Sequence, residues 1–368
     1  MYLLNIMLLL SFFVSTINAQ KVSIKTVGIP LADHYAGIIA YEKYRDQMKY
    51  ADYQIKILSG PNLVRRYFRS YSDVDIAFNV APMVMDMYAK KPDFRWISLI
   101  HRDGNALVIN HNINAKVMLN INITKGKPNG KVALILKELK KQNKKPVEIA
   151  VPSLLATHTT ILYKYLKENN LTMGLHSSTA DVSLAIVKPL TSIAYLKAQN
   201  IRRTPAAFEQ SLPWAEMIEL EGNGHIAWYS KDVMKHDKGH VECIIIAKDS
   251  AIAKKRDAIQ EVIYFIHKSG RDIETARLKG GKKFDDIIKM IRKHMPQHTV
   301  DSIKKSLDPK IMAINYKNLN VDKNSKDSFK KIMDLAYEGG FIKQKITIDE
   351  LADESFSTDI TVDFSKGN

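Results

Sequence analysis

The feature that most restricts the fold of this chain is a regular alternation of strand-like and helix-like stretches, which begins at Val22. Val22–Val27 has the β-branched, alternating pattern of a strand, and Tyr35–Tyr44 carries apolar residues at helical spacing. Further strands are expected at Tyr53–Leu58, Val74–Phe78, Trp96–Ile100 and Ala106–Ile109, and further helices at Asn62–Ser70 and Pro82–Tyr88. This order predicts a mainly parallel sheet that is covered by helices and binds ligands beyond the carboxyl ends of its strands.

The chain changes character over residues 110–130, which are rich in Asn, Lys and Gly and which we interpret as a loop or a crossover. A second alternation follows, with helices at Lys131–Gln142, Thr159–Asn169 and Leu190–Ala198 and strands at Val147–Val151, Val182–Val187, Ala206–Gln210 and Val241–Ala247. From Ile252 onward the chain is predicted to be almost wholly helical. We therefore expect two α/β lobes, joined by crossovers near Asn110 and over Met234–His240. Residues 21–110 begin the first lobe, 111–236 form the second, and 237–368 return to the first lobe and end in a helical tail.

The first twenty residues have the pattern of a signal peptide. An apolar run, Ile6–Val14, is followed by polar residues and then by Ala19, a small residue at the expected cleavage point. The run is about half of the ~20 residues that a membrane-spanning helix needs. An uncleaved anchor or a buried strand is the alternative. We expect residues 1–20 to be removed and the remaining chain to be exported to the periplasm.

Charge and cysteine content narrow the classes of partner. The net charge is +16, but the lysines are dispersed among apolar residues at helical spacing, which predicts solvated helix faces and only a weak general preference for anions. Because a DNA-binding motif is missing and export is expected, we exclude nucleic acid as a partner. Cys243 is the only cysteine, so an intrachain disulfide is excluded, and its apolar surroundings predict a buried strand thiol.

Two strand-to-helix loops share one layout. Val27–His34 (VGIPLADH) and Val151–His158 (VPSLLATH) each contain a strand end, a proline and a histidine at the start of a helix. A helix N-terminus offers unpaired N–H groups and a partial positive charge, which suit an anion, and a histidine adds a directional donor. An ordinary N-cap or a structural histidine is the alternative. The candidate ligand-binding residues of these loops are Asp33, His34, Thr157, His158 and Thr159.

Other polar or aromatic residues stand at further strand ends. One follows the third expected strand, and one precedes the strand at Ala106–Ile109. Two more follow the strand at Ala206–Gln210, and the last precedes the strand at Val241–Ala247. A role in the core or in the fold is the alternative, above all for the tryptophan. The additional candidate ligand-binding residues are Asn79, Asn105, Ser211, Trp214 and His240.

At these residues the chain resembles the solute-binding proteins of nitrate, bicarbonate, sulfonate and taurine transporters, and most of all their nitrate- and bicarbonate-binding branch. Asn143–Asn170 is similar to the branch's K-P…F-P-x-S-T-H-N-x-W-x-R-Y-W stretch, with His158 at its histidine. Four shorter motifs also occur in the order of the family. Asp103–Ala106 (N-G-Q-A) precedes this stretch, and three motifs follow it: Pro189–Lys197 (P-P-x-x-M-x-x-x-L-K), Ser211–Trp214 (G-E-P-W) and Lys235–Val241 (K-x-H-P-E-K-V). The likeness extends from about Val22 to Ile266.

The resemblance implies a two-lobed fold of the type II periplasmic-binding class, which delivers its ligand to a membrane permease. It assigns His158 as a direct ligand donor. It also places Asn105 at an amide-bearing Gln of the family, Asn79 at an aromatic residue, His240 at a ligand-side Lys and Ser211 at a Gly. Because these departures remove much of a nitrate pocket, a planar oxyanion, a sulfonate and a larger heteroaromatic compound all stay open as ligands.

The leading hypothesis is therefore a periplasmic, monomeric substrate-binding protein of an ABC-type importer. We expect it to enclose a small anionic solute by hinge closure. We expect no catalytic activity, no cofactor and no metal. An enzyme on the same scaffold is one alternative, but a single cysteine cannot supply the cysteine-rich iron site of pyrimidine-synthesising relatives. His34, His158 and His240 with Asp33 lack any local metal-ligand spacing. A sensor that reports its ligand to a membrane receptor is the other alternative.

Overall fold

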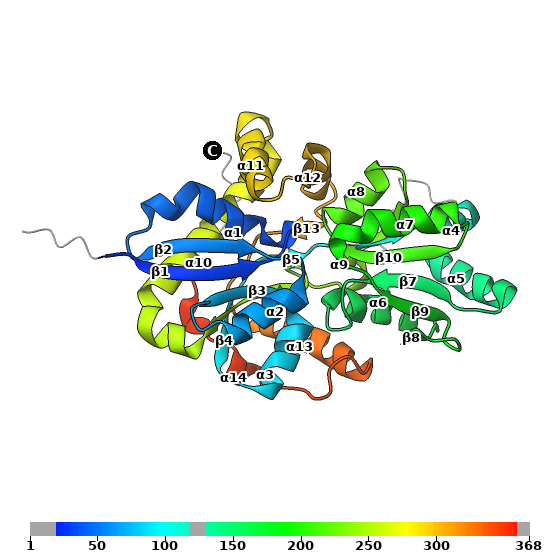
Figure 1. Ribbon diagram of the computed structural model, residues 1–368, viewed down its shortest axis with the longest axis horizontal. Coiled ribbons are helices and arrows are strands. Elements are labelled where there is room, and N and C mark those ends of the chain that lie inside the picture. Colours follow the sequence, from blue (N-terminus) through cyan, green and yellow to red (C-terminus); the bar gives the residue numbers. More distant parts are fainter. Residues whose placement is uncertain (1–19, 118–127, 129, 359–368) are drawn as a thin grey trace, which may run out of the picture.

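The computed structural model describes residues 20–117, 128 and 130–358, and Figure 1 labels most of its helices and strands. The expected signal peptide lies outside the described residues, apart from Gln20. Among the described residues, no helix has an apolar stretch long enough to cross a membrane.

The first lobe is built on a sheet with the strand order β2–β1–β3–β12–β4. β1, β2 and β3 are parallel, and β12 runs antiparallel between β3 and β4. The carboxyl ends of β1, β3 and β4 and the start of β12 therefore share one edge. The bounds of these strands are β1 (Val22–Gly28), β2 (Ala51–Ile57), β3 (Ile76–Val80), β4 (Phe94–Leu99) and β12 (Cys243–Lys248).

The second lobe is built on a sheet with the order β11–β6–β10–β7–β9–β8. Its strands are parallel except β6, which runs antiparallel between β10 and β11. The carboxyl ends of β7 and β10 and the start of β6 thus lie at the edge that faces the first lobe (Figure 1). The bounds are β6 (Asn105–Ile109), β7 (Val147–Val151), β8 (Met173–Leu175), β9 (Val182–Ile186), β10 (Ala206–Ser211) and β11 (His225–Tyr229).

Helices cover both sheets, and several begin where the sequence favours a helix start. Proline occupies the first turn of α2 and α3, where its missing N–H has no helical partner to lose. The first lobe carries α1 (Tyr35–Ile39), which continues as a π-helical turn η2 (Ala40–Tyr44), and α2 (Pro61–Ser70), α3 (Ala81–Lys90), α10 (Asp249–Lys279), α11 (Gly281–His294), α13 (Lys323–Glu338) and α14 (Ile348–Leu351). The second lobe carries α4 (His111–Val117), α5 (Gly130–Asn143), α6 (Thr157–Glu168), α7 (Ser192–Ile201), α8 (Trp214–Leu220) and α9 (Ser230–Val233). The short 3₁₀ turns are η1 (Ala32–His34), η3 (Arg45–Gln47), η4 (Pro189–Thr191) and η5 (Glu354–Phe356).

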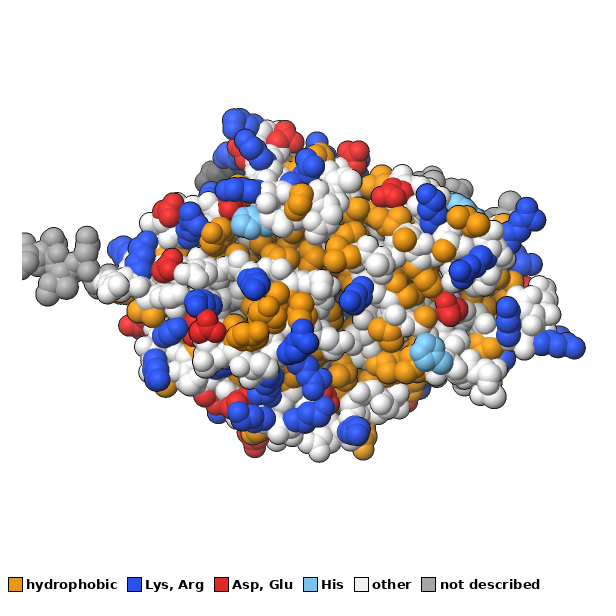
Figure 2. Space-filling model, viewed as in Figure 1, with side chains coloured by type: hydrophobic (Ala, Val, Ile, Leu, Met, Phe, Trp, Pro, Cys, Tyr) orange, Lys and Arg blue, Asp and Glu red, His pale blue; other side chains and the backbone are white. Residues whose placement is uncertain are grey.

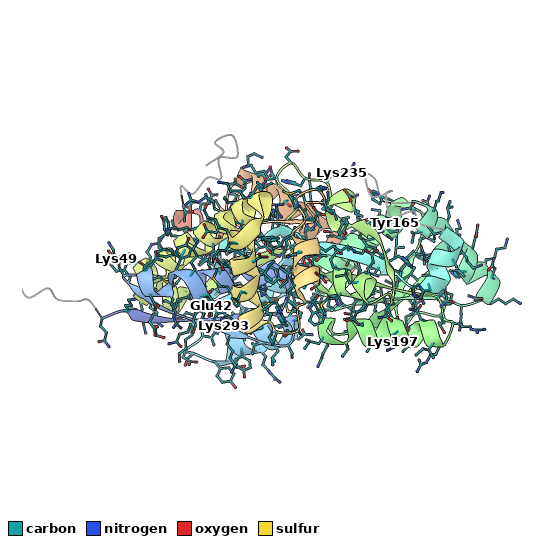
Figure 3. All side chains as sticks on the ribbon, turned by 90° about the horizontal axis from the view of Figure 1, so that it is seen from above. Glu42, Lys49, Tyr165, Lys197, Lys235 and Lys293 are labelled. Atoms are coloured by element: carbon teal, nitrogen blue, oxygen red, sulfur yellow. The ribbon has the colours of Figure 1, made fainter. Side chains whose placement is uncertain are left out.

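The C-terminal helices return to the first lobe, as expected from the sequence. Phe329 of α13 stacks on the buried Trp96 of β4, with ring centroids 4.8 Å apart. On another side of this lobe, Lys293 of α11 forms a 2.7 Å ion pair with Glu42 of η2, and Figure 3 shows the two residues side by side. Between the lobes, α12 (Val300–Ser306) packs against α8, so the tail also contacts the second lobe.

The lobes are joined by two crossing segments that lie together. The outgoing segment contains β5 (Arg102–Asp103), which pairs with β13 (Ile314–Asn315) from the tail. The returning segment follows α9, and His240 N donates a 2.9 Å hydrogen bond to Asp103 Oδ1. Buried Arg102 also donates to Gly239 O and to Asn318 O. These bonds tie both crossings and the tail into one hinge.

Most expected elements are confirmed, with three corrections. The expected boundary at residue 110 is wrong, because β6 pairs with β10 and β11 in the second sheet and the chain has already crossed at β5. The Asn-rich stretch that was interpreted as a loop begins with helix α4, which packs against α5. Strand β11 and helix α8 were not predicted from the sequence.

The dispersed charge expected from the sequence is visible on the surface. On the face shown in Figure 2, lysine and arginine side chains are spread over both lobes and are mixed with acidic ones, without one continuous basic patch. Several lysines of the described residues pair with a carboxylate in the same helix, as Lys164 does with Glu168 and Lys282 with Asp286. The net charge therefore says little about the interior of the protein.

Candidate functional site

The facing edges of the two sheets bring together a group of polar side chains that we call the interlobe cluster. The first lobe and its returning strand supply residues from the turn after β1, the loop after β4, and the start of β12. The second lobe supplies residues from the start of β6, the end of β10 and the first turn of α6. All of these side chains are almost completely buried. The cluster consists of Asp33, His101, Asn105, His158, Glu209, Ser211, Glu242 and Cys243.

Contacts within the cluster connect the lobes. His158 Nε2 lies 2.6 Å from Ser211 Oγ, and this hydroxyl lies 3.5 Å from Asp33 Oδ2 in the first lobe. On the other side of its ring, His158 Nδ1 lies 3.5 Å from Glu242 Oε1. Around the cluster, Ala32 N donates to Leu212 O at 2.7 Å. The lobes are thus in direct contact, and the cluster lies between them.

Many polar atoms of the cluster have no hydrogen-bond partner within the described part of the chain. They include both carboxylate oxygens of Glu209, both ring nitrogens of His101 and Oδ1 of Asp33. Buried polar groups in folded proteins are nearly always hydrogen-bonded, because an unpaired one costs about 1–3 kcal/mol. A concentration of such atoms at one place is therefore the signature of a site that is completed by a bound molecule.

The acidic residues of the cluster favour their neutral forms. Burial raises the pKa of Glu209 well above its ordinary value. Burial also raises the pKa of Glu242, and the neighbouring Asp33 and Glu209 raise it further. Burial raises the pKa of Asp33 in the same direction. Among the described residues, no lysine or arginine forms an ion pair with any of these three carboxyl groups, which is consistent with their neutral forms.

The histidines of the cluster also favour their neutral forms. Burial, with a smaller contribution from the nearby His240, lowers the pKa of His158 to about 3. The pKa of His101 lies well below its ordinary value because of burial and because other histidines lie close to it. A neutral imidazole offers one donor and one acceptor, so the cluster presents mixed hydrogen-bonding groups rather than a cationic pocket.

The structure brings some of the predicted ligand-binding residues to the cluster or to its border. Asp33, Asn105, His158 and Ser211 belong to it, and neither amide atom of Asn105 has a partner. At the border, the Asn79 amide nitrogen and His34 Nε2 are buried and unpaired. The other ring nitrogen of His34 accepts a 2.8 Å hydrogen bond from Ile29 N.

Other predicted residues are held by the protein itself. Thr157 Oγ1 donates to Glu242 O, and Thr159 Oγ1 donates to Ser153 O. Trp214 Nε1 donates a 2.9 Å hydrogen bond to Pro30 O, so this indole joins the lobes. His240 is bonded through both ring nitrogens, to Ser230 Oγ at 2.9 Å and to Val241 O at 3.1 Å. These contacts give Trp214 and His240 roles in the interlobe contact and the hinge.

The sequence analysis missed Glu209 and Glu242, and it did not include His101 or Cys243 among the candidate ligand-binding residues. Each glutamate stands at one end of an apolar stretch. Glu209 follows Ala206–Phe208, and Glu242 precedes Cys243–Ala247. An acidic side chain in a buried strand is rare unless it is paired or used. That rule was the signal in the sequence that could have found them.

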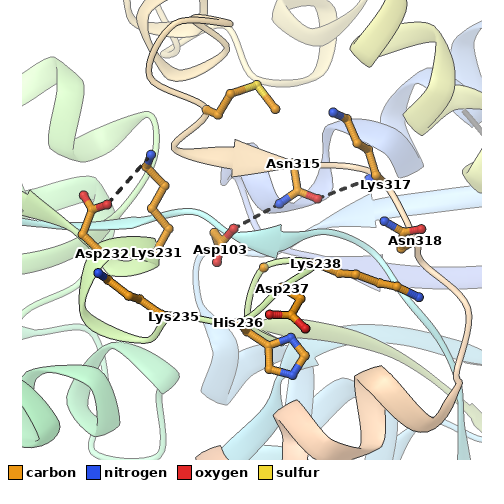
Figure 4. A pocket seen from close by; sticks show the side chains of 12 residues that line it. Asp103, Lys231, Asp232, Lys235, His236, Asp237, Lys238, Asn315, Lys317 and Asn318 are labelled. Atoms are coloured by element: carbon orange, nitrogen blue, oxygen red, sulfur yellow. Dashed lines mark hydrogen bonds and ion pairs between the residues drawn. The ribbon is translucent and has the colours of Figure 1, made fainter. Parts of the chain in front are cut away.

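Two open pockets lie near the interlobe cluster but outside it. A cleft of about 360 Å³ opens between the lobes, between the loop before α2 and the loops after β7 and β9, with Arg66, Pro152 and Lys188 in its wall. A second pocket of about 420 Å³ lies at the hinge, where Figure 4 shows Lys231, Lys235 and Lys238 around Asp103 and Asp237. The lysines of the hinge pocket stand beside acidic side chains, and its walls come mainly from the crossing segments.

Comparison with known proteins agrees with this architecture. The model of the NMT1-like family matches residues 18–277. A search of the curated proteins gives no match. Among solved structures, the periplasmic nitrate-binding protein NrtA from Synechocystis PCC 6803 has a TM-score of 0.71 at 16% identity, covering 92% of this chain and 87% of that one. The ligand-binding component of an ABC-type import system from Staphylococcus aureus, with zinc bound, has a TM-score of 0.68 at 15% identity, covering 94% and 100%.

The fold is not limited to binding proteins. The desulfurization enzyme DSZB has a TM-score of 0.57 at 8% identity, covering 91% of this chain and 97% of that one. Identities this low show a common fold, and the two-lobed architecture expected from the sequence is confirmed.

Proposed function

This chain belongs to the NMT1-like family, and on that premise we propose that it is the solute-binding component of an ABC-type import system. One observation carries the proposal above the others. The two lobes meet edge to edge on a buried cluster in which many polar atoms have no hydrogen-bond partner among the described residues, at the place where a protein of this architecture encloses a small molecule.

Hinge closure is the mechanism that the contacts support. Opening the lobes about the crossing segments would separate Ser211 from Asp33 and His158 from Glu242, and would expose both sheet edges to solvent. A solute that bonds to groups of both lobes binds the closed form more tightly than the open form, and so shifts the equilibrium towards closure. The closed form is then the one that a membrane permease recognises.

The polarity of the cluster narrows the class of solute. Three carboxyl groups that favour their neutral forms give a nitrate-like anion no positively charged partner, whereas their carbonyl oxygens accept hydrogen bonds from N–H or O–H groups. A heteroaromatic compound with ring or exocyclic N–H groups suits these acceptors better than an oxyanion does. The nitrate, bicarbonate and sulfonate class expected from the sequence is the competing assignment, and the experiment below includes it.

We propose that the protein is exported and works as a monomer without catalysing a reaction. The periplasmic and ABC-import descriptions of the structural neighbours support export and a permease partner. A ligand sensor that couples to a membrane receptor would use the same closed form, and co-purification with a permease or with a kinase distinguishes the two.

A thermal-shift screen tests the proposed function. The solutes are nitrate, bicarbonate, taurine, an alkanesulfonate and a set of aminopyrimidines. A solute at a hundredfold its Kd should raise the unfolding free energy by about 2.7 kcal/mol. Stabilisation by one of these solutes, lost in His158→Ala, supports the proposal. If no solute stabilises the protein, and native mass spectrometry of protein purified from its own host shows no bound small molecule, the proposal is wrong.

A further inference from the structure

Three potential metal ligands meet at the first-lobe side of the interlobe cluster. Asp33 comes from the turn after β1, His101 from the loop after β4, and Cys243 from the start of β12. Their ligand atoms all lie within 4.8 Å of one another. Asp33 Oδ2 lies 3.6 Å from His101 Nε2 and 3.5 Å from Cys243 Sγ. Three strands of one sheet, β1, β4 and β12, thus place a carboxyl group, an imidazole and a thiol around one point.

The bonding of these groups is incomplete. Both ring nitrogens of His101 and Oδ1 of Asp33 are buried and have no hydrogen-bond partner among the described residues. The side chains of all three residues are completely buried. The Cys243 thiol donates a 3.5 Å hydrogen bond to Asp33 Oδ2, but the 3.6 Å separation of His101 Nε2 from the same oxygen is longer than a good N–H···O hydrogen bond, which falls at about 2.7–3.2 Å. Protein contacts alone therefore leave this corner unsatisfied, and an ion bound by all three groups would satisfy it.

The spacing matches a metal site. In a tetrahedral zinc site with bonds of about 2.0–2.3 Å, neighbouring ligand atoms lie roughly 3.3–3.8 Å apart. The distances from Asp33 Oδ2 to the other two ligand atoms fall in that range. The mixture of oxygen, nitrogen and sulfur ligands is typical of zinc and of neighbouring transition metals, and not of magnesium or calcium.

Charge leads to the same assignment. A divalent cation would displace the protons of the Asp33 carboxyl group and the Cys243 thiol and would neutralise the two negative charges so formed, for which the described residues supply no lysine or arginine partner. The second-lobe side of the cluster would keep His158 and Glu209 for the solute. Because all three ligands belong to the first lobe and its returning strand, metal binding does not require the lobes to be closed.

We propose that Asp33, His101 and Cys243 form a binding site for one transition-metal dication of the zinc class, with a fourth position open towards the second lobe. The site goes beyond the proposed function, because it assigns a metal ion to the first-lobe side of the cluster. It shares Asp33 with the groups proposed for the solute, whereas His158 and Glu209 stay outside it. The sequence led us to expect no metal, since the ligands lie far apart along the chain and give no local spacing.

Cobalt substitution tests this site. The full chain is stripped with a chelator and titrated with Co²⁺, and the absorption spectrum and the stoichiometry are measured. We expect one Co²⁺ per chain and a near-ultraviolet charge-transfer band, which requires a thiolate ligand and therefore reports Cys243. Zn²⁺ should displace the cobalt and remove the band. Absence of the band in the parent protein contradicts the proposal.

Variants locate the ion. Cys243→Ser should lose the band, and His101→Gln should weaken Co²⁺ binding at least tenfold, with folding checked by circular dichroism. The matched control is His225→Gln, because His225 and His111 form a surface histidine pair, 3.3 Å apart, that could bind metal without a thiolate. This control should keep the band. A band that survives in Cys243→Ser, or that disappears in His225→Gln, would overturn the proposal. Solute binding is measured separately with His158→Ala, so either proposal can fail alone.

Discussion

The Nδ1 atom of His158 lies 3.5 Å from Oε1 of Glu242, which places the first turn of α6 in the second lobe against the strand that returns to the first. Both side chains are buried, and their pKa values are shifted in opposite directions, each towards the neutral form. A neutral base thus faces a neutral acid across the boundary between the lobes. The pair can donate and accept hydrogen bonds, and a solute between the lobes can use both abilities.

The first prediction concerns His158. In His158→Ala, Ser211 Oγ and Glu242 lose the imidazole between them, and the solute loses a hydrogen-bonding group from the second lobe. We expect affinity for the solute to fall at least tenfold, which corresponds to about 1.4 kcal/mol. Isothermal titration calorimetry measures this change, with His225→Ala as the control. Equal affinities in the parent and in His158→Ala would remove His158 from the site.

The second prediction concerns pH. Burial raises the pKa of Glu209, Glu242 and Asp33 in the folded protein, so above their ordinary pKa values the folded state binds more protons than the unfolded state. The pKa of His158 in the folded protein is about 3, so its contribution to the unfolding free energy is lost as pH falls from 6.5 towards 3. Above pH 6.5 this contribution is constant. Between pH 6.5 and 8, the unfolding free energy of the solute-free protein should therefore fall. Urea unfolding at a series of pH values checks this, and a flat profile would contradict it.

The third prediction isolates one carboxyl group. Glu209→Gln keeps the size of the side chain but cannot ionise, and neither oxygen of Glu209 has a hydrogen-bond partner to lose. Between pH 6.5 and 8, the unfolding free energy of the variant should fall less steeply than that of the parent. The two slopes should differ by up to about 1.4 kcal/mol per pH unit. Glu219→Gln, in the partly exposed group near Lys305, is the control and should follow the parent. Parallel profiles for the parent and Glu209→Gln would show that Glu209 is already ionised.

The fourth prediction concerns the hinge. Gly239 has a φ of +87°, and a Cβ there would lie 2.4 Å from Asp103 Oδ2 and 2.7 Å from Asn315 Nδ2. Gly222 has a φ of +68° but an open surrounding, so Gly222→Ala carries the backbone strain without the clash. We expect Gly239→Ala to lower the unfolding free energy by roughly 1–3 kcal/mol more than Gly222→Ala does. Chemical unfolding of both variants measures the difference, and equal losses would mean that the crossing segments adjust freely.

Much of the fold could be predicted from the sequence because parallel strands and their helices leave strong local patterns. β7 and β12 are apolar runs, and α2 begins at a proline after a loop, so each was located within a few residues. Strand β11 was missed because His225–Tyr229 mixes polar and aromatic residues without clear alternation. The first crossing was placed too late because only long-range pairing assigns β6 to the second sheet.

The candidate site was predicted in part, for a related reason. Strand ends and helix starts can be located from the sequence, so Asp33, Asn105, His158 and Ser211 could be proposed from it, and the structure places these four residues in the interlobe cluster. The sequence cannot show which polar atoms stay unpaired after the lobes meet. Trp214 bonds to Pro30 O instead, and the sequence did not point to Glu209 and Glu242, which carry two of the three buried carboxyl groups of the cluster.

The location of the solute is the central claim, and one comparison tests it directly. The Kd of the solute identified in the screen is measured for the parent, for Asp33→Asn in the interlobe cluster, and for Lys235→Ala in the hinge pocket of Figure 4. We predict that Asp33→Asn weakens binding at least tenfold and that Lys235→Ala leaves it unchanged. A loss of affinity in Lys235→Ala, with parent-like binding in Asp33→Asn, would place the solute at the hinge and contradict the account.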